Sequence, residues 1–165
     1  MSPAPSRHRF HGDPTRFQVL ADYVADRYGK RVKTIADVAG GQGMLCRILR
    51  KRYNYDCEVV DPRGWTLRGV PNQAIEMDAT LARYYDLIIG LHPDEATRAV
   101  AESACVRPAI IIPCCNFWSK DRLGRDELVD AIGSYYQRHG VRYERVTFGF
   151  RGPKNIGLVS EPPTG

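Results

Sequence analysis

The stretch Thr34-Ile-Ala-Asp-Val-Ala-Gly-Gly-Gln-Gly43 decides how this chain folds, because it joins an apolar run to a turn rich in glycine. Residues 44–53 follow directly, and their apolar positions 44, 45, 48 and 49 have the period of a helix. A backbone that turns sharply from a strand into a helix favours glycine, because a Cβ restricts positive φ angles and close contacts. The order strand, glycine turn, helix predicts the start of a βαβ unit.

Strand patterns recur on both sides of this unit. We predict strands at residues 56–60, 74–77, 86–91 and 109–112, and two closing strands at 142–148 and 155–160. The runs at 86–91 and 109–112 are almost wholly apolar, which is typical of strands covered on both faces. Helices are predicted at 15–28 with Asp13 as N-cap, after His92-Pro-Asp-Glu up to about residue 105, and at 126–137. Strands that alternate with helices predict an α/β doubly wound sheet.

Composition limits the kind of protein. The chain has 165 residues, of which 43% are hydrophobic, as expected for one globular domain. Its apolar runs are far shorter than the roughly 20 residues of a membrane span, and its first ten residues lack the apolar segment of a signal peptide. We therefore expect a cytoplasmic protein without membrane contact. We expect an N-terminal arm at residues 1–12, a single domain at 13–160 and a loose tail at 161–165.

The charged residues and cysteines indicate the kind of partner and the redox setting. The formal net charge of +5 favours an anionic partner, although solvated surface arginines explain it equally well. The five cysteines include neither a Cys-x-x-Cys pair nor a zinc-like spacing, so we predict reduced thiols and no metal. Cys114 and Cys115 are adjacent, and on extended chain their side chains point to opposite faces, so we expect no bond between them.

The glycine turn allows two interpretations as a cofactor site. A dinucleotide fingerprint, G-x-G-x-x-G, needs a third glycine where this chain has Cys46, which disfavours a nicotinamide cofactor. The segment instead resembles motif I of class I S-adenosylmethionine-dependent methyltransferases, D-x-G-x-G-x-G. Asp37, Ala39, Gly41 and Gly43 match that motif, with alanine in place of the first glycine. The resemblance extends over about residues 34–118.

This resemblance implies a Rossmann-like methyltransferase sheet, mostly parallel, closed by an antiparallel hairpin. It implies S-adenosylmethionine as the cofactor, bound by Asp37, Ala39, Gly40, Gly41, Gly43, Asp61, Asp78 and Leu91. Asp61, at the end of the second strand, matches the acid that accepts hydrogen bonds from the ribose hydroxyls. Asp78, after the third strand, matches the residue that contacts the adenine. A turn-starting aspartate and a helix cap are the structural alternatives for these two residues.

Two loops follow the fourth and fifth strands, where ligands of an open parallel sheet bind. The loops contain Gly-Leu-His-Pro-Asp-Glu95 and Pro113-Cys-Cys, a pair that resembles the tRNA uridine 2'-O-methyltransferases and related proteins of uncertain substrate. His92 is a candidate general base, because neutral imidazole accepts a proton near pH 7. Asp94 and Asn116 are further catalytic candidates, with helix capping as the alternative for Asp94 and core packing as the alternative for Asn116.

Aromatic and basic residues near these loops are candidates for binding the acceptor. Phe117 and Trp118 could stack on a base or could pack in the core. Lys120, Arg151 and Lys154 could hold an anionic substrate or could be solvated. We expect a methyltransferase that acts on a hydroxyl or ring nitrogen of RNA, either tRNA or rRNA, as a homodimer or with a partner protein. A small-molecule methyltransferase, a non-catalytic module with a cofactor fold and a nicotinamide-dependent reductase stay open.

Overall fold

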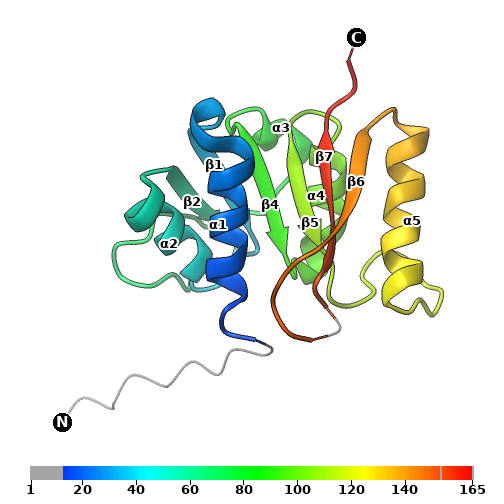
Figure 1. Cartoon of the computed structure of the whole chain (residues 1–165), viewed down its shortest axis with the longest axis horizontal. Helices are drawn as coiled ribbons and strands as arrows, with labels where there is room; N and C mark the ends of the chain where they lie inside the picture. The colour runs from blue at the N-terminus through cyan, green and yellow to red at the C-terminus, as the bar shows by residue number, and fades with distance from the viewer. Residues whose placement is uncertain (1–12, 153, 165) are drawn as a thin grey trace.

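A computed structural model of the chain describes residues 13–152 and 154–164 (Figure 1). The expected N-terminal arm at 1–12 lies outside the described residues. The helices are α1 (Arg16–Tyr28), α2 (Met44–Tyr53), α3 (Ala79–Ala82), α4 (Thr97–Ser103) and α5 (Arg125–Arg138), with the short 3-10 turns η1 (Gly29–Arg31) and η2 (Asp94–Ala96). The strands are β1 (Thr34–Val38), β2 (Asp56–Val60), β3 (Asn72–Gln73), β4 (Leu87–Leu91), β5 (Ala109–Ile112), β6 (Arg142–Thr147) and β7 (Ile156–Glu161).

The strands form one sheet in the order β3-β2-β1-β4-β5-β7-β6. The strands from β3 to β5 run parallel to their neighbours, and β7 is antiparallel to both β5 and β6. The predicted sheet, doubly wound and mostly parallel with an antiparallel closing hairpin, is confirmed. The strand order reverses between β1 and β4, which marks the place where folds of this type bind ligands.

Alternate residues of the central strands pack into two separate hydrophobic cores, one on each face of the sheet. Ile35, Ile89 and Ile110 pack with α1 and α2 on one face of the sheet. Ala36, Ile88 and Ile111 pack with α4 and α5 on the other face. Figure 1 shows α1 in front of the sheet and α4 behind it. Because both faces are covered, β1, β4 and β5 are apolar along their length, as the sequence indicated.

The third strand is not where the sequence placed it. We predicted residues 74–77, but β3 consists of Asn72 and Gln73, which pair with Val59 and Val60 of β2. The chain of β2 turns away at Asp61-Pro62, so residues after Gln73 have no strand to pair with. Ile75 is accordingly 46% exposed. The apolar pattern at 74–77 therefore reflected partial burial without strand pairing.

The start of the first helix also differs from the prediction. The helix begins at Arg16, and Thr15 rather than Asp13 occupies the N-cap position. Asp13 instead closes the preceding turn, since its Oδ1 accepts a hydrogen bond from the Thr15 N–H at 2.9 Å. Its Oδ2 accepts from the Arg151 N–H at 2.8 Å. Asp13 thus ties the start of α1 to the connection between β6 and β7.

The closing hairpin extends one residue into the tail that we expected at 161–165. Glu161, the first residue of that expected tail, still pairs with Arg142 in the sheet.

Within the described residues no helix combines the length and the apolar character that crossing a membrane requires.

The glycine turn contains one alanine in a conformation that disfavours alanine. Ala39 has a φ of +54°, at the position where the resembled motif has glycine. A left-handed conformation costs a residue with a Cβ about 1–2 kcal/mol. Glycine avoids this cost but loses about 0.5–1 kcal/mol through the greater freedom of the unfolded chain.

We therefore expect Ala39→Gly to leave the free energy of unfolding unchanged or to raise it by up to about 1 kcal/mol. The matched control is Ala36→Gly, three residues earlier on the extended and buried part of β1, which should lower the free energy of unfolding. Denaturant unfolding of both variants checks this. Equal destabilisation by both substitutions would contradict the argument.

Candidate functional site

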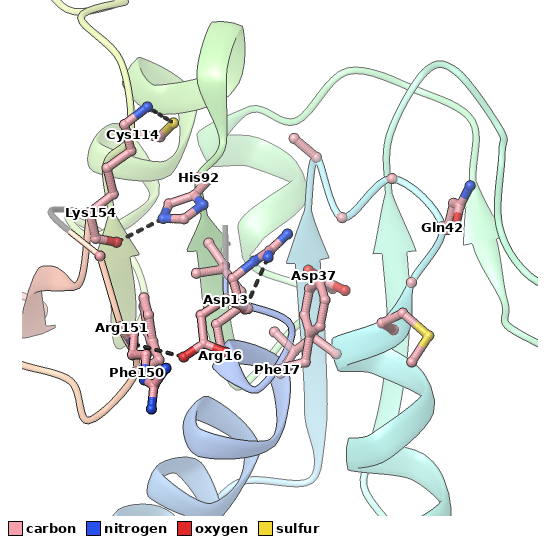
Figure 2. A pocket seen from close by; sticks show the side chains of 18 of the residues that line it. Asp13, Arg16, Phe17, Asp37, Gln42, His92, Cys114, Phe150, Arg151 and Lys154 are labelled. Carbon is pink, nitrogen blue, oxygen red and sulfur yellow. Dashed lines mark hydrogen bonds between the residues drawn. The ribbon is translucent and has the colours of Figure 1, made fainter. Parts of the chain in front are cut away.

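A cavity of about 550 Å³ lies at the carboxyl ends of β1 and β4, where the strand order reverses (Figure 2). Four parts of the chain enclose it: the start of α1, the glycine turn after β1, the ends of β4 and β5, and the connection between β6 and β7. The lining includes Asp13, Arg16, Phe17, Asp37, Ala39, Gly40, Gly41, Gly43, Arg63, Leu91, His92, Cys114, Phe150, Arg151 and Lys154. Most of the predicted cofactor residues therefore meet in one place.

The glycines of the turn have separate physical roles. A Cβ at Gly40 would lie 2.5 Å from Oδ2 of Asp37, and a Cβ at Gly43 would lie 2.7 Å from Cγ1 of Val70. Gly43 also has a φ of +82°. Gly41 differs, because a Cβ there would meet only the Arg63 guanidinium at 3.9 Å. Gly40 and Gly43 let the turn pack, and Gly41 leaves its backbone open to the cavity.

Asp37 is a buried carboxyl group at the edge of the cavity. The residue is 2% exposed, and its Oδ2 has no hydrogen-bond partner among the described residues. Burial raises the pKa of Asp37 to about 7, and the nearby Asp61 carboxylate adds to this effect. A buried polar atom without a partner is costly in a folded protein, so a ligand that donates to it gains affinity.

Asp61 is held by its neighbour Arg63. The Arg63 Nη2 donates to Asp61 Oδ2 at 2.7 Å, the Arg63 N–H donates to Oδ1 at 2.9 Å, and the Gly41 N–H donates to Oδ2 at 3.1 Å. Burial alone would raise the pKa of Asp61, but these hydrogen bonds hold it below its usual value. Asp61 is therefore an ionised carboxylate beneath the glycine turn. Asp61 itself is buried and is not among the residues that line the cavity, whereas its partner Arg63 lines it with a half-exposed side chain.

His92 projects into the cavity from the end of β4. Its backbone has a φ of +50°, and its Nε2 lies 2.9 Å from the carbonyl oxygen of Lys154. Since a carbonyl only accepts, Nε2 carries a proton, and in the neutral ring Nδ1 has the lone pair. Burial lowers the pKa of His92, so the ring is neutral at pH 7. His92 thus presents a base at Nδ1, as a general base requires.

Several of the predicted site residues lie outside this cavity. Asp78 caps α3, because its Oδ1 accepts from the Leu81 N–H at 2.7 Å. Asn116 organises its own loop, since its Oδ1 accepts from the N–H groups of Trp118 and Ser119, each at 3.1 Å. The helix cap that was the alternative for Asp78 is therefore present, whereas Asn116 hydrogen-bonds within its own loop. Asp94 is exposed and lies beside the cysteines that follow β5.

The predicted aromatic platform is split. Trp118 is 8% exposed and packs under the guanidinium of Arg98, whose Cζ lies 4.1 Å from the ring centroid. This burial corrects the hypothesis that Trp118 stacks on a substrate. Phe117, in contrast, is 45% exposed, and Lys120 is also exposed. Of the residues of this loop that we predicted to bind the acceptor, Phe117 and Lys120 are therefore the accessible ones.

Some cavity residues were missed by sequence analysis. Arg16 and Phe17 looked like an ordinary first helical turn, and Phe150 looked like the end of a strand. They reach the cavity only because the start of α1 meets the connection between β6 and β7 through Asp13 and Arg151. Asp13 and Arg151 lie at opposite ends of the sequence, and no local sequence pattern indicates that they are in contact.

Comparison with known proteins agrees with this geometry. No protein-family model and no curated protein matches the sequence. Among solved structures, the chain resembles a sugar N-methyltransferase from Streptoalloteichus, with a TM-score of 0.56 and 15% identity over 98% of both chains. It also resembles a ribosomal protein L11 methylase from Lactobacillus delbrueckii subsp. bulgaricus, with a TM-score of 0.55 and 15% identity over 99% of this chain and 92% of that one.

A third similar structure is a methyltransferase of calicheamicin biosynthesis in its SAH-bound form, with a TM-score of 0.53 and 16% identity over 88% of this chain and 54% of that one. At identities this low, the likeness concerns the fold. The chain has the Rossmann-like fold of class I methyltransferases.

The buried Asp37 predicts a pH dependence of stability. The pKa of Asp37 is about 7 in the folded chain, whereas an aspartate in the unfolded chain has its ordinary pKa of 3.8. Between these two values the folded state binds a proton that the unfolded state has released, so stability falls as the pH rises from about 4 to 7. Asp37→Asn should remove this slope. The quantity to compare is the free energy of unfolding of the variant minus that of the native chain. This difference should be larger at pH 8 than at pH 4.5, by on the order of a few kcal/mol.

Asp86 provides a control of opposite sign. Burial alone would raise its pKa, but hydrogen bonds from the N–H groups of Lys33 and Thr34 lower it. Asp86→Asn should cost most stability near neutral pH and less as the pH falls. Denaturant unfolding at several pH values measures both variants. A parallel response of the two would contradict the assignment of Asp37.

Proposed function

We propose that this chain is an S-adenosylmethionine-dependent methyltransferase. The observation that carries the proposal is the cavity itself, in which an open glycine turn and a buried, unpartnered carboxyl group meet at the reversal of the strand order. The volume of about 550 Å³ falls in the range that small-molecule sites usually have. The SAH-bound calicheamicin methyltransferase of similar fold supports the choice of cofactor.

The residues present fit this cofactor. We expect its amino group to meet Asp37, since a cation supplies both a hydrogen bond and a counter-charge to the unpartnered Oδ2. The open backbone at Gly41 and the buried Leu91 give the nucleoside a surface for close contact. We expect the ribose hydroxyls to donate to Asp61. When bound, S-adenosylmethionine supplies an electrophilic methyl group on its sulfonium sulfur.

The chain contributes alignment and a proton acceptor. The Lys154 carbonyl holds the His92 ring in one orientation and one tautomer, so Nδ1 can accept the proton of an acceptor hydroxyl or ring nitrogen. Arg151 and Lys154 add positive charge at the same end of the cavity. Alignment of an acceptor next to a base is the main work that a protein has to do in methyl transfer.

We further propose that the acceptor is RNA, either tRNA or rRNA. The net charge of +5, the two cations at the cavity and the exposed Phe117 and Lys120 support a phosphate-bearing, base-containing substrate. We place the reaction in the cytoplasm, which agrees with the five free thiols. We also propose that the chain acts as a homodimer or with a partner protein, which would enlarge the surface that contacts RNA.

A small-molecule acceptor is the second candidate. It is favoured by the sugar N-methyltransferase of similar fold, which matches over 98% of both chains. Incubation with methyl-labelled S-adenosylmethionine separates the candidates. Label in total RNA supports the RNA acceptor, and label only in small molecules of a metabolite extract supports the second candidate. Cofactor binding without any label transfer would favour a non-catalytic module.

His92 provides the first test of mechanism. His92→Ala should lower methyl transfer by roughly 10²–10⁴-fold, the usual contribution of a general base, and should leave cofactor affinity within a few-fold. The matched control is His139→Ala on the last turn of α5, which lies outside the cavity lining. Rates and binding constants are measured side by side. Unchanged turnover of the His92 variant would remove it from the base role.

Asp61 provides the test of cofactor contact. Asp61→Asn should weaken binding of S-adenosylhomocysteine by about tenfold or more, because it replaces a charged acceptor with a neutral one. Asp56→Asn is the control, since Asp56 is exposed at the opposite end of the same strand. Calorimetric titration measures both. Equal affinities for the Asp61 variant and the native chain would show that the ribose does not use this carboxylate.

A further inference from the structure

The pair Cys114-Cys115 has no part in the function proposed above. Both thiols are free, and their Sγ atoms lie 3.4 Å apart. The expectation that adjacent side chains point to opposite faces does not hold here, because β5 ends at Ile112 and the chain beyond Pro113 is no longer extended strand. Cys114 lines the cavity, and Cys115 is exposed. Two sulfur ligands are thus presented together beside the candidate His92 base.

A carboxylate from the neighbouring loop completes the group. A carboxylate oxygen of Asp94 and both sulfur atoms lie within 4.8 Å of one another. Asp94 has a φ of +48°, in the left-handed region. This conformation is unfavourable for a residue with a Cβ, so it persists only where the surrounding structure holds it. The Thr97 hydroxyl donates to the Asp94 carbonyl oxygen at 2.6 Å and helps to fix this turn. Ligands from the ends of two adjacent strands therefore converge.

The structure already places a positive charge against this group. The Lys154 Nζ lies 3.2 Å from the Cys114 sulfur and 3.7 Å from the Cys115 sulfur. Figure 2 shows the Lys154 side chain extending to Cys114 while its carbonyl oxygen faces His92. The ammonium group can therefore balance negative charge on these sulfur atoms when both thiols ionise.

We propose that Cys114, Cys115 and Asp94 bind a thiophilic divalent cation of the Zn²⁺ class at the acceptor end of the cavity. Tetrahedral bonds of about 2.3 Å from zinc to sulfur put two sulfur ligands about 3.8 Å apart, so the observed 3.4 Å needs only a small adjustment. Sulfur ligands select zinc over magnesium or calcium. Two thiolates and one carboxylate exceed the charge of the ion by one, and Lys154 balances the remainder.

This arrangement has the form of a catalytic rather than a structural zinc site. Three protein ligands leave a fourth position open, and Cys114 borders the cavity in which the acceptor would lie. A water molecule or an acceptor hydroxyl in that position would have its pKa lowered by the ion. Binding displaces the thiol protons to solvent, so affinity should rise with pH.

The test uses Co²⁺ as a spectroscopic probe for Zn²⁺, added to the full chain after reduction and removal of metal. We expect a thiolate-to-cobalt absorption band that saturates at one equivalent and disappears when Zn²⁺ is added. The double variant Cys114→Ser/Cys115→Ser should lose the band, and Asp94→Asn should weaken binding at least tenfold. Cys105→Ser, which removes a free and partly buried thiol elsewhere, should bind like the native chain.

Thermal unfolding of each variant shows whether it is folded, and the comparison is made among folded variants. A native chain without the band, or a band that survives loss of both cysteines, would overturn the proposal. The measurement involves neither cofactor nor acceptor. Its result is therefore independent of whether the chain transfers methyl groups.

Discussion

The burial of one carboxyl group, Asp37, constrains the whole of the candidate site. It ends the central strand β1 and fills the space against Gly40, where any Cβ would come within 2.5 Å of the carboxylate. The turn can therefore be made only by glycine at that position. At the end of the turn, Gly43 lies close to Val59 and Val70, where a Cβ would not fit. This close contact fixes how α2 approaches β2. Strand, turn and helix are thus positioned by contacts that start from a single acidic side chain.

The rest of the site is assembled on this turn by distant parts of the chain. The strand order reverses between β1 and β4, which opens the cavity and brings His92 opposite the glycines. Asp13 links the start of α1 to Arg151, and Lys154 orients His92 through its carbonyl oxygen. The glycine side of the cavity thus depends on the parallel strands, whereas the His92 side also depends on the antiparallel hairpin.

Sequence alone predicted the parts of this structure that local physics determines. Apolar runs gave β1, β4 and β5, and the glycines gave the turn, because burial and positive φ angles restrict the residues allowed there. The two-residue β3 was misplaced, since its length depends on where β2 turns away at Asp61-Pro62. Trp118 could not be assigned from its type, because a ring that packs under Arg98 and a ring that binds substrate look identical in sequence. The side of the cavity formed by Phe17 and Phe150 needed the tertiary contact of Asp13 with Arg151.

The central claim is that the unpartnered Oδ2 of the Asp37 carboxyl group receives the amino group of the cofactor. Titration calorimetry with S-adenosylhomocysteine at pH 6, in buffers of different ionisation enthalpy, counts the protons released on binding. Asp37 has a pKa of about 7 in the folded chain and is mostly protonated at this pH, and a bound cation lowers that pKa. We predict release of a large fraction of one proton by the native chain and almost none by Asp37→Asn. Absence of binding, or binding by the native chain without proton release, would contradict the account.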